Sequence, residues 1–247
     1  MKTIFDIPQT AETPRYISHR GFQPLAPANS LPGFRYAGLL GQWAIETDVH
    51  FTRDGKAVCC HNPTVDDTFD GVGAIADMTW KELSALRMNT GNRLDCLTDS
   101  DRRIPLFSEY LAVCRKYHSV PFIELKTDDA ERVVRLVREA GLEDGGAVMS
   151  SVSLDRLAET RKYTKDMFVH WIFGNEENMD RLVGLGFSGM SWNDSDWEHF
   201  PQEKIDLCHR HGVRVCLRAG DSRAAVGHML AMGLDYIPSN CMHGELE

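Results

Sequence analysis

Short strand-like runs alternate with amphipathic helical segments along almost the whole chain, and no other sequence feature constrains its fold as strongly. Apolar runs rich in β-branched and aromatic residues predict strands, whereas apolar residues at helical spacing predict helices. We expect strands near residues 15–19, 43–50, 121–126, 147–152, 168–173, 188–192, 213–218 and 235–239. We expect helices near residues 30–40, 106–117, 129–140, 153–163, 175–184, 201–211 and 221–232.

Strands that alternate with helices usually pair in parallel, because each helix provides a right-handed crossover to the next strand. A doubly wound sheet usually has a glycine-rich phosphate turn after its first strand, and this sequence has none. A length of 247 residues is typical of a (β/α)₈ barrel. We therefore predict an α/β fold, a TIM barrel that forms a single domain over residues 1–247.

The connection over residues 51–105 is too long for an ordinary loop between a strand and its helix. It is rich in turn-forming residues and includes one helical segment near residues 79–86. In a TIM barrel, the loops that follow the strands lie at the C-terminal mouth, where active sites form. We expect this small insertion after the second strand to lie over the mouth.

Composition and charge exclude several classes of function. The chain has 27 basic and 36 acidic residues, and a net charge of −9 argues against nucleic-acid binding. No apolar run approaches the roughly 18 residues of a membrane span, and residues 1–16 lack a signal-peptide core. The seven cysteines form no CxxC pair or zinc-site spacing, which is typical of free thiols in a reducing compartment. We expect a cytoplasmic protein that acts on a small molecule, without nucleic-acid or membrane partners; the oligomeric state stays open.

Two predicted strands carry pairs of charged residues at alternate positions. Glu46 and Asp48 project to one side of their strand, and so do Glu124 and Lys126. Adjacent carboxylates repel one another unless a positive charge lies between them. Carboxylate oxygens are the ligands that Mg²⁺ and Ca²⁺ prefer. Glu46, Asp48 and Glu124 therefore form a candidate site for a divalent cation.

Two histidines bracket the carboxylate pair in the sequence. His19 ends the first predicted strand, and His61 follows a short apolar run. Because an ordinary histidine has a pKa near 6.5, one ring can act as a base and the other as an acid near neutral pH. Arg20 and Lys126 could neutralise phosphoryl oxygens. This combination indicates metal-assisted cleavage of a phosphate ester.

These motifs make the chain resemble the glycerophosphodiester phosphodiesterases. That family has a His-Arg-Gly opening, a Glu-x-Asp pair, a Thr-x-Asp-Gly turn, a second His and a later Glu-x-Lys. The resemblance covers essentially the whole chain, including the insertion after the second strand. The matching residues occur in the same order: His19-Arg20-Gly21, Glu46/Asp48, Thr52-Arg53-Asp54-Gly55, His61 and Glu124/Lys126.

The resemblance implies a TIM barrel and a role for each matching residue. Glu46, Asp48 and Glu124 would bind a divalent cation, either Mg²⁺ or Ca²⁺ or else Mn²⁺. The activity implied is hydrolysis of glycerophosphodiesters or sugar phosphodiesters to a phosphomonoester of the glycerol 3-phosphate type and an alcohol, within lipid and glycerol metabolism. His19 and His61 would be the acid/base pair, and Arg20 and Lys126 would contact phosphate.

Two alternatives stay open beside hydrolysis. A phospholipase D-like lyase would release a cyclic phosphate without hydrolysing it, and a non-catalytic barrel would only bind phosphodiesters. The histidine pair argues against a pure binding site, because binding alone requires no acid and base.

The sequence departs from the family pattern at three places near the expected pocket. Ala28 stands where the family usually has a Glu, and Asn62 where it usually has an Asp; the end of the seventh strand, residues 216–220, also differs. Asn29 and Ser30, which follow Ala28, are interpreted as a helix N-cap.

Two further side chains are candidate substrate-binding residues. Arg218 is expected near the end of the seventh strand and Trp192 on the sixth, with Trp171 as another aromatic surface. An arginine beside a flat aromatic ring favours a polar alcohol, such as glycerol or a sugar, over a lipid chain.

Overall fold

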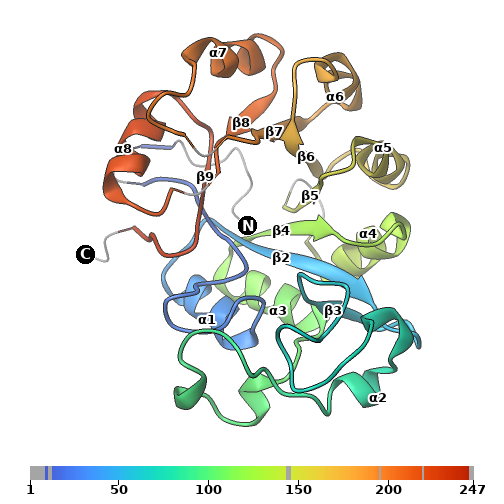
Figure 1. Cartoon of the computed structure of the whole chain (residues 1–247). Coiled ribbons are helices and arrows are strands. Elements are labelled where there is room, and N and C mark those ends of the chain that lie inside the picture. The colour runs from blue at the N-terminus through green and yellow to red at the C-terminus, as the bar shows by residue number, and fades with distance from the viewer. Residues whose placement is uncertain (1–8, 11–12, 143–145, 195, 219, 245–247) are drawn as a thin grey trace.

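The computed structural model contains a curved parallel sheet that is surrounded by helices (Figure 1). It describes residues 9–10, 13–142, 146–194, 196–218 and 220–244. Residues 1–8 lie outside the described residues; they are part of the segment 1–16 in which the sequence shows no signal-peptide core. Ala219, at the end of the seventh predicted strand, also lies outside them. The parallel strands are β1 (Tyr16–Ser18), β2 (Ala44–Phe51), β4 (Val120–Leu125), β5 (Val148–Ser151), β6 (Phe168–Gly174), β7 (Ser188–Trp192), β8 (Arg214–Cys216) and β9 (Ile237–Ser239).

The parallel strands close into a barrel. The sheet runs in the order β8-β7-β6-β5-β4-β2-β1-β9, so that β8 and β9 lie at its two ends. Two backbone hydrogen bonds join these ends: Asp235 N–H donates to the Val215 carbonyl at 2.9 Å, and Gly220 N–H donates to the Pro238 carbonyl at 2.8 Å. The predicted TIM barrel is confirmed.

Helices follow most of the barrel strands, close to the positions that the sequence predicts. In α4, Val133, Val134 and Val137 are buried against the sheet, and the Asp129 side chain caps the first turn. The predicted helix 175–184 begins later, because the Asn175 side chain accepts from Asn178 N–H in a turn. The barrel helices are α1 (Leu31–Leu39), α3 (Phe107–Tyr117), α4 (Ala130–Glu139), α5 (Leu154–Tyr163), α6 (Met179–Leu185), α7 (Gln202–Arg210) and α8 (Arg223–Ala231).

Large side chains fill the lower part of the barrel, which is the end opposite the mouth, near the N-terminal ends of the strands. Trp43 stacks on Tyr236, and Phe122 and Phe168 meet the same tyrosine ring edge-on. His170 Nδ1 is 2.7 Å from the Tyr236 hydroxyl, and burial lowers the pKa of His170 to about 3, so this ring is neutral. Because the lower barrel is packed, polar chemistry is confined to the C-terminal ends of the strands.

The insertion after β2 has a small hydrophobic cluster of its own, formed by Val58, Cys60, Val65, Phe69, Ile75, Leu83, Met88 and Ile104. Strand β3 (Ala57–Cys59) pairs antiparallel with β2, and the sequence did not predict it as a barrel element. Asn92 in the insertion donates to the Gln23 carbonyl at 2.8 Å, which joins the insertion to the loop after β1. The insertion also contains α2 (Trp80–Leu83) and the 3₁₀ turns Ile75–Asp77, Leu94–Cys96 and Ser100–Arg102.

All seven cysteines are free thiols, as the sequence predicts, and five of them are buried. Within the described ranges, no helix is both long enough and apolar enough to cross a membrane.

Candidate active site

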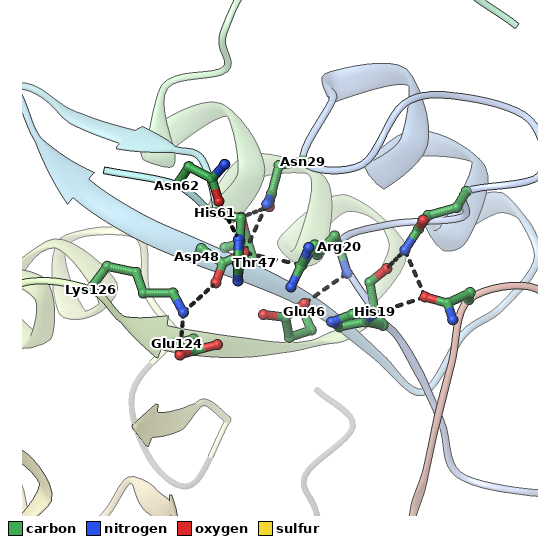
Figure 2. A network of polar contacts seen from close by, with 12 residues as sticks. His19, Arg20, Asn29, Glu46, Thr47, Asp48, His61, Asn62, Glu124 and Lys126 are labelled. Atoms are coloured by element: carbon green, nitrogen blue, oxygen red, sulfur yellow. Dashed lines mark hydrogen bonds and ion pairs between the residues drawn. The ribbon is translucent and has the colours of Figure 1, made fainter. Parts of the chain in front are cut away.

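Three carboxylates from two neighbouring strands converge at the mouth of the barrel (Figure 2). Glu46 and Asp48 lie on β2, and Glu124 lies on β4 directly opposite Asp48 in the strand register. One oxygen from each carboxylate lies within 4.8 Å of the others. The parallel register thus brings together residues that are 76 positions apart in the sequence, counting from 48 to 124.

Glu46 and Asp48 are buried, Glu124 is half-buried, and the negative charges of the three carboxylates repel one another. Glu46 is 7% exposed and Asp48 is 0% exposed. Burial, together with the charges of Asp48 and Glu124, raises the pKa of Glu46 well above its ordinary value. Burial and the charge of Asp48 also raise the pKa of Glu124. Glu46 and Glu124 are therefore destabilised as free anions.

The donor set fits a hard divalent cation. Asp48 Oδ1 is buried and has no hydrogen-bond partner among the described residues. The convergent donors are all carboxylate oxygens, which Mg²⁺ and Ca²⁺ prefer as ligands. A cation between them would give Asp48 Oδ1, which accepts no hydrogen bond although Lys126 Nζ lies 3.3 Å away, a closer partner and would relieve the repulsion.

Two basic side chains border the carboxylates. Arg20 Nε is 3.5 Å from Asp48 Oδ2, and the Arg20 backbone N–H donates to Glu46 Oε2 at 2.7 Å. Lys126 Nζ is 3.3 Å from Asp48 Oδ1 and also contacts Glu124. Burial opposes the charge of Lys126, but Asp48 and Glu124 outweigh it and raise the Lys126 pKa. Both basic groups thus lie within 3.5 Å of an Asp48 oxygen.

A tight turn after β1 presents the Arg20 amide to Glu46. Arg20 has a φ of +58° and Gly21 a φ of +84°. A side chain at Gly21 would place its Cβ 2.8 Å from the Gly33 carbonyl carbon, which is closer than real contacts allow. Glycine is therefore required at this position, and the turn depends on it.

The two histidines reach the site from β1 and from the insertion (Figure 2). The His19 backbone N–H donates to the Ser239 carbonyl at 2.9 Å, which continues the pairing of β1 with β9. Burial, reinforced by the charge of Arg20, lowers the pKa of His19, so its ring is neutral near pH 7. His61 follows β3, which β2 holds next to Asp48. The structure thus brings both rings to the carboxylates.

Asn29 belongs to this site, although the sequence indicated a helix cap. It is 4% exposed; its Nδ2 donates to Asp48 Oδ2 at 2.8 Å, and its Oδ1 accepts from Thr47 Oγ1 at 2.7 Å. Ser30 is the actual cap, accepting from Gly33 N–H at 3.1 Å. The signal that could have found it is its position directly after Ala28, one of the places where the sequence departs from the family pattern.

The prediction that Trp192 binds substrate is wrong. Trp192 is 6% exposed and packs in the outer cluster with Ile205 and Cys208 of α7. Gly189 faces the barrel interior, where an added Cβ would meet Tyr236 and Phe168. Strand alternation then directs Trp192 toward the helices. Trp171 lies in the same outer cluster and is no mouth residue either.

Arg218 is exposed and lies just beyond β8. Its guanidinium carbon is 5.7 Å from the centre of the Phe173 ring, which is 40% exposed. Phe173 lies at an irregularity in the pairing of β6 with β7 and has a φ of +61°. Cys216, two residues before Arg218, packs in the barrel interior. The side chain that pairs with Arg218 is thus Phe173 and not a tryptophan.

A model of the glycerophosphoryl diester phosphodiesterase family matches residues 19–173, which include all three carboxylates and both histidines. A glycerophosphodiester phosphodiesterase of Caldanaerobacter subterraneus is 24% identical over 90% of this chain and 91% of its own length. Glycerophosphodiester phosphodiesterase 1 of mouse is 36% identical over 44% of this chain. That match spans 33% of the length of the mouse protein.

Solved structures share the fold over nearly the whole chain. An Oleispira antarctica phosphodiesterase in complex with the product sn-glycerol-3-phosphate superposes with a TM-score of 0.81 at 22% identity, covering 92% of this chain and 93% of that one. A glycerophosphodiester phosphodiesterase from Agrobacterium tumefaciens has a TM-score of 0.76 at 22% identity, covering 92% of this chain and 97% of the other.

Proposed function

The chain belongs to the glycerophosphoryl diester phosphodiesterase family, and from this premise we propose that it hydrolyses glycerophosphodiesters or sugar phosphodiesters. The products are a phosphomonoester of the glycerol 3-phosphate type and an alcohol. The observation that carries the proposal is the convergence of Glu46, Asp48 and Glu124 between two histidines and two basic side chains. A site that only bound phosphodiesters would need no acid and base beside its cation.

In the proposed mechanism, Arg20 and Lys126 hold the phosphoryl oxygens. Glu46, Asp48 and Glu124 would hold a divalent cation, and the chemistry it would supply there is Lewis-acid stabilisation of the charge on the phosphoryl oxygens. His19, neutral because its pKa is lowered, takes the proton from the attacking water or substrate hydroxyl. His61 gives a proton to the oxygen of the leaving alcohol. Mg²⁺ is the cation that we propose first, with Ca²⁺ and Mn²⁺ as substitutes.

The outcome of the reaction is tested by ³¹P NMR of the products with glycerophosphocholine as substrate. Hydrolysis gives a phosphomonoester signal, whereas a cyclising lyase gives a cyclic phosphate that persists. A mixture in which the cyclic signal decays to monoester would identify the substrate hydroxyl as the first nucleophile. Binding without any new ³¹P signal would refute enzymatic cleavage.

We expect a charge effect on stability when Glu46 is replaced by Gln. The pKa of Glu46 is raised in the folded state, so the folded protein binds this proton more tightly than the unfolded chain does. The resulting contribution to the free energy of unfolding is fully present below the unfolded-state pKa of about 4.3 and is lost as pH rises through the folded-state pKa. Without metal, Glu46→Gln should therefore have a higher Tm than the wild type at pH 7.5, by a few degrees. The two proteins should converge near pH 4.

Divalent cations should make the wild type more stable than Glu46→Gln, which reverses the order of their Tm values. A ligand that binds only the folded state stabilises the protein by about 2.7 kcal/mol at a hundredfold excess over its Kd. Differential scanning fluorimetry with and without Mg²⁺ measures both effects. Glu203→Gln on the exposed face of α7 is the matched control and should track the wild type. A Glu46→Gln variant that is less stable at pH 7.5 without metal would contradict the charge argument.

We propose that Arg218 selects polar alcohols. Its guanidinium lies over the exposed Phe173 ring, with N–H donors that can bind hydroxyl groups. Arg218→Ala should lower kcat/KM for glycerol and sugar headgroups by roughly tenfold or more, the range expected for losing a charged hydrogen bond. Rates for lysophospholipids should change less.

The measurement is a ranking of kcat/KM across soluble and lipid headgroups. Arg181→Ala on α6 removes another exposed arginine, one that pairs with Asp155, and should leave the ranking intact. An unchanged ranking in Arg218→Ala, or a wild-type preference for long-chain lipid esters, would remove Arg218 from substrate selection.

A further inference from the structure

His19 is the first member of a chain of three polar side chains. Its Nδ1 lies 2.8 Å from Asn240 Oδ1, and Asn240 Nδ2 donates to Asp221 Oδ2 at 2.6 Å. The other Asp221 oxygen accepts from the Asn240 backbone N–H at 2.7 Å and from Ser239 Oγ at 2.8 Å. These contacts hold Asp221 and the Asn240 amide in one arrangement.

His61 begins a second chain of the same composition. Its Nδ1 lies 2.7 Å from Asn62 Oδ1, and Asn62 Nδ2 donates to Asp67 Oδ2 at 2.9 Å. The two chains come from different parts of the fold, one from the end of β9 and the other from the insertion. The same order of His, Asn and Asp therefore serves both rings.

The carboxylates determine which end of each amide faces its histidine. Asp221 and Asp67 are exposed, and an ionised carboxylate can only accept hydrogen bonds. The amide NH₂ group must therefore face the carboxylate, which turns the amide oxygen toward the imidazole. At Asn240 a further donor, Gln23 Nε2 at 2.7 Å, requires the same orientation.

An amide oxygen that faces Nδ1 accepts only if Nδ1 carries hydrogen. We propose that Asn240 and Asn62 are positioning residues that hold His19 and His61 as Nδ1–H tautomers. The Nε2 lone pair of each ring is then free to exchange protons at the site. Asp221 and Asp67 act one step farther away by fixing the amide orientation.

The inference deepens the proposed function and rests on it for its catalytic meaning. The amide oxygen accepts from Nδ1–H whether or not Nε2 also carries a proton. His19 can therefore gain a proton at Nε2, and His61 can lose one there, without any rearrangement of the ring or of its partner. This property is what a general base and a general acid require of their supports.

The direct test is the tautomer state of the two rings, measured by long-range ¹H–¹⁵N correlation NMR on metal-free protein at pH 8. His19→Gln and His61→Gln assign the resonances. We expect the Nδ1–H tautomer to dominate at both residues in the wild type. A dominant Nε2–H tautomer at either ring would overturn the proposal for that chain. This readout needs no substrate, so it stands or fails independently of the proposed reaction.

Variants of Asn62 separate positioning from a merely structural role. Asn62→Leu removes the acceptor and should shift His61 toward Nε2–H while lowering kcat by at least about tenfold, with KM within about twofold. Asn62→Asp keeps an acceptor for Nδ1–H and should retain the tautomer and most of kcat. Asp66→Ala, next to Asp67 but outside the chain, is the control and should change neither.

Asn240→Leu should give the same result at His19, with its folding checked by the amide spectrum. Loss of kcat in Asn62→Leu and Asn240→Leu without any tautomer shift would contradict positioning, as would full activity in both variants. If the wild type showed the Nδ1–H tautomers but no phosphodiesterase activity, the proposed function would be refuted, whereas the assignment of Asn240 and Asn62 as positioning residues would stand.

Discussion

Removal of divalent cations by a chelator should abolish phosphodiester cleavage, and Mg²⁺, Mn²⁺ or Ca²⁺ should restore it. Glu46, Asp48 and Glu124 lie within 4.8 Å of one another, and Arg20 and Lys126 leave Asp48 Oδ1 without a hydrogen bond. Lewis-acid stabilisation of a phosphoryl group is worth several kcal/mol, which corresponds to roughly a thousandfold in rate. Release of phosphomonoester, followed by ³¹P NMR, measures the effect.

Asp48→Asn should give a comparable loss in the presence of excess cation, because it removes the central ligand while keeping the size of the side chain. Glu203→Gln is again a matched control, since it neutralises an exposed carboxylate on α7. A chelator that is saturated with Mg²⁺ before addition should have no effect. Full turnover by the chelated enzyme would end the assignment of these residues as cation ligands.

Replacing either histidine by alanine should lower kcat by at least about 100-fold, the lower range for loss of a general acid or base. His19 and His61 both reach the carboxylate site, and each ring is held by an asparagine side chain. The double variant should be much less than additively impaired, because the acid and the base act on one transition state. Steady-state kinetics of the two single variants and the double variant give this comparison.

Loss of fold is an alternative cause that the same experiment must exclude. Circular dichroism and Tm should stay close to the wild type, since His19 and His61 lie at the mouth and not among the side chains that fill the lower barrel. His199→Ala, an exposed histidine paired with Asp196, is the control. Near-wild-type turnover in either single variant would remove that histidine from the mechanism.

The barrel was predictable because its signals are local. Alternating runs of strand and helix character repeat along the chain, and each needs only a window of about ten residues to be recognised. The pairs Glu46/Asp48 and Glu124/Lys126 could also be recognised in the sequence, because residues two apart on a strand project to the same side. A parallel barrel then leaves only one end at which such pairs can meet.

The tertiary structure alone decided which other side chains join them. Asn240 is 221 positions from His19, and it reaches the ring only because β9 pairs with β1 and closes the barrel. Asn29 was misassigned because a helix cap and a buried site residue share one local sequence pattern. Trp192 was misassigned because the inward or outward direction of a strand residue depends on the neighbouring strands.

The sequence by itself thus determined the fold class and the charged residues at the ends of its strands, because periodicity and spacing are properties of short segments. Only the tertiary structure decided the partners of those residues. Hydrogen bonds between distant segments depend on strand register and on closure of the barrel, and no local pattern encodes either.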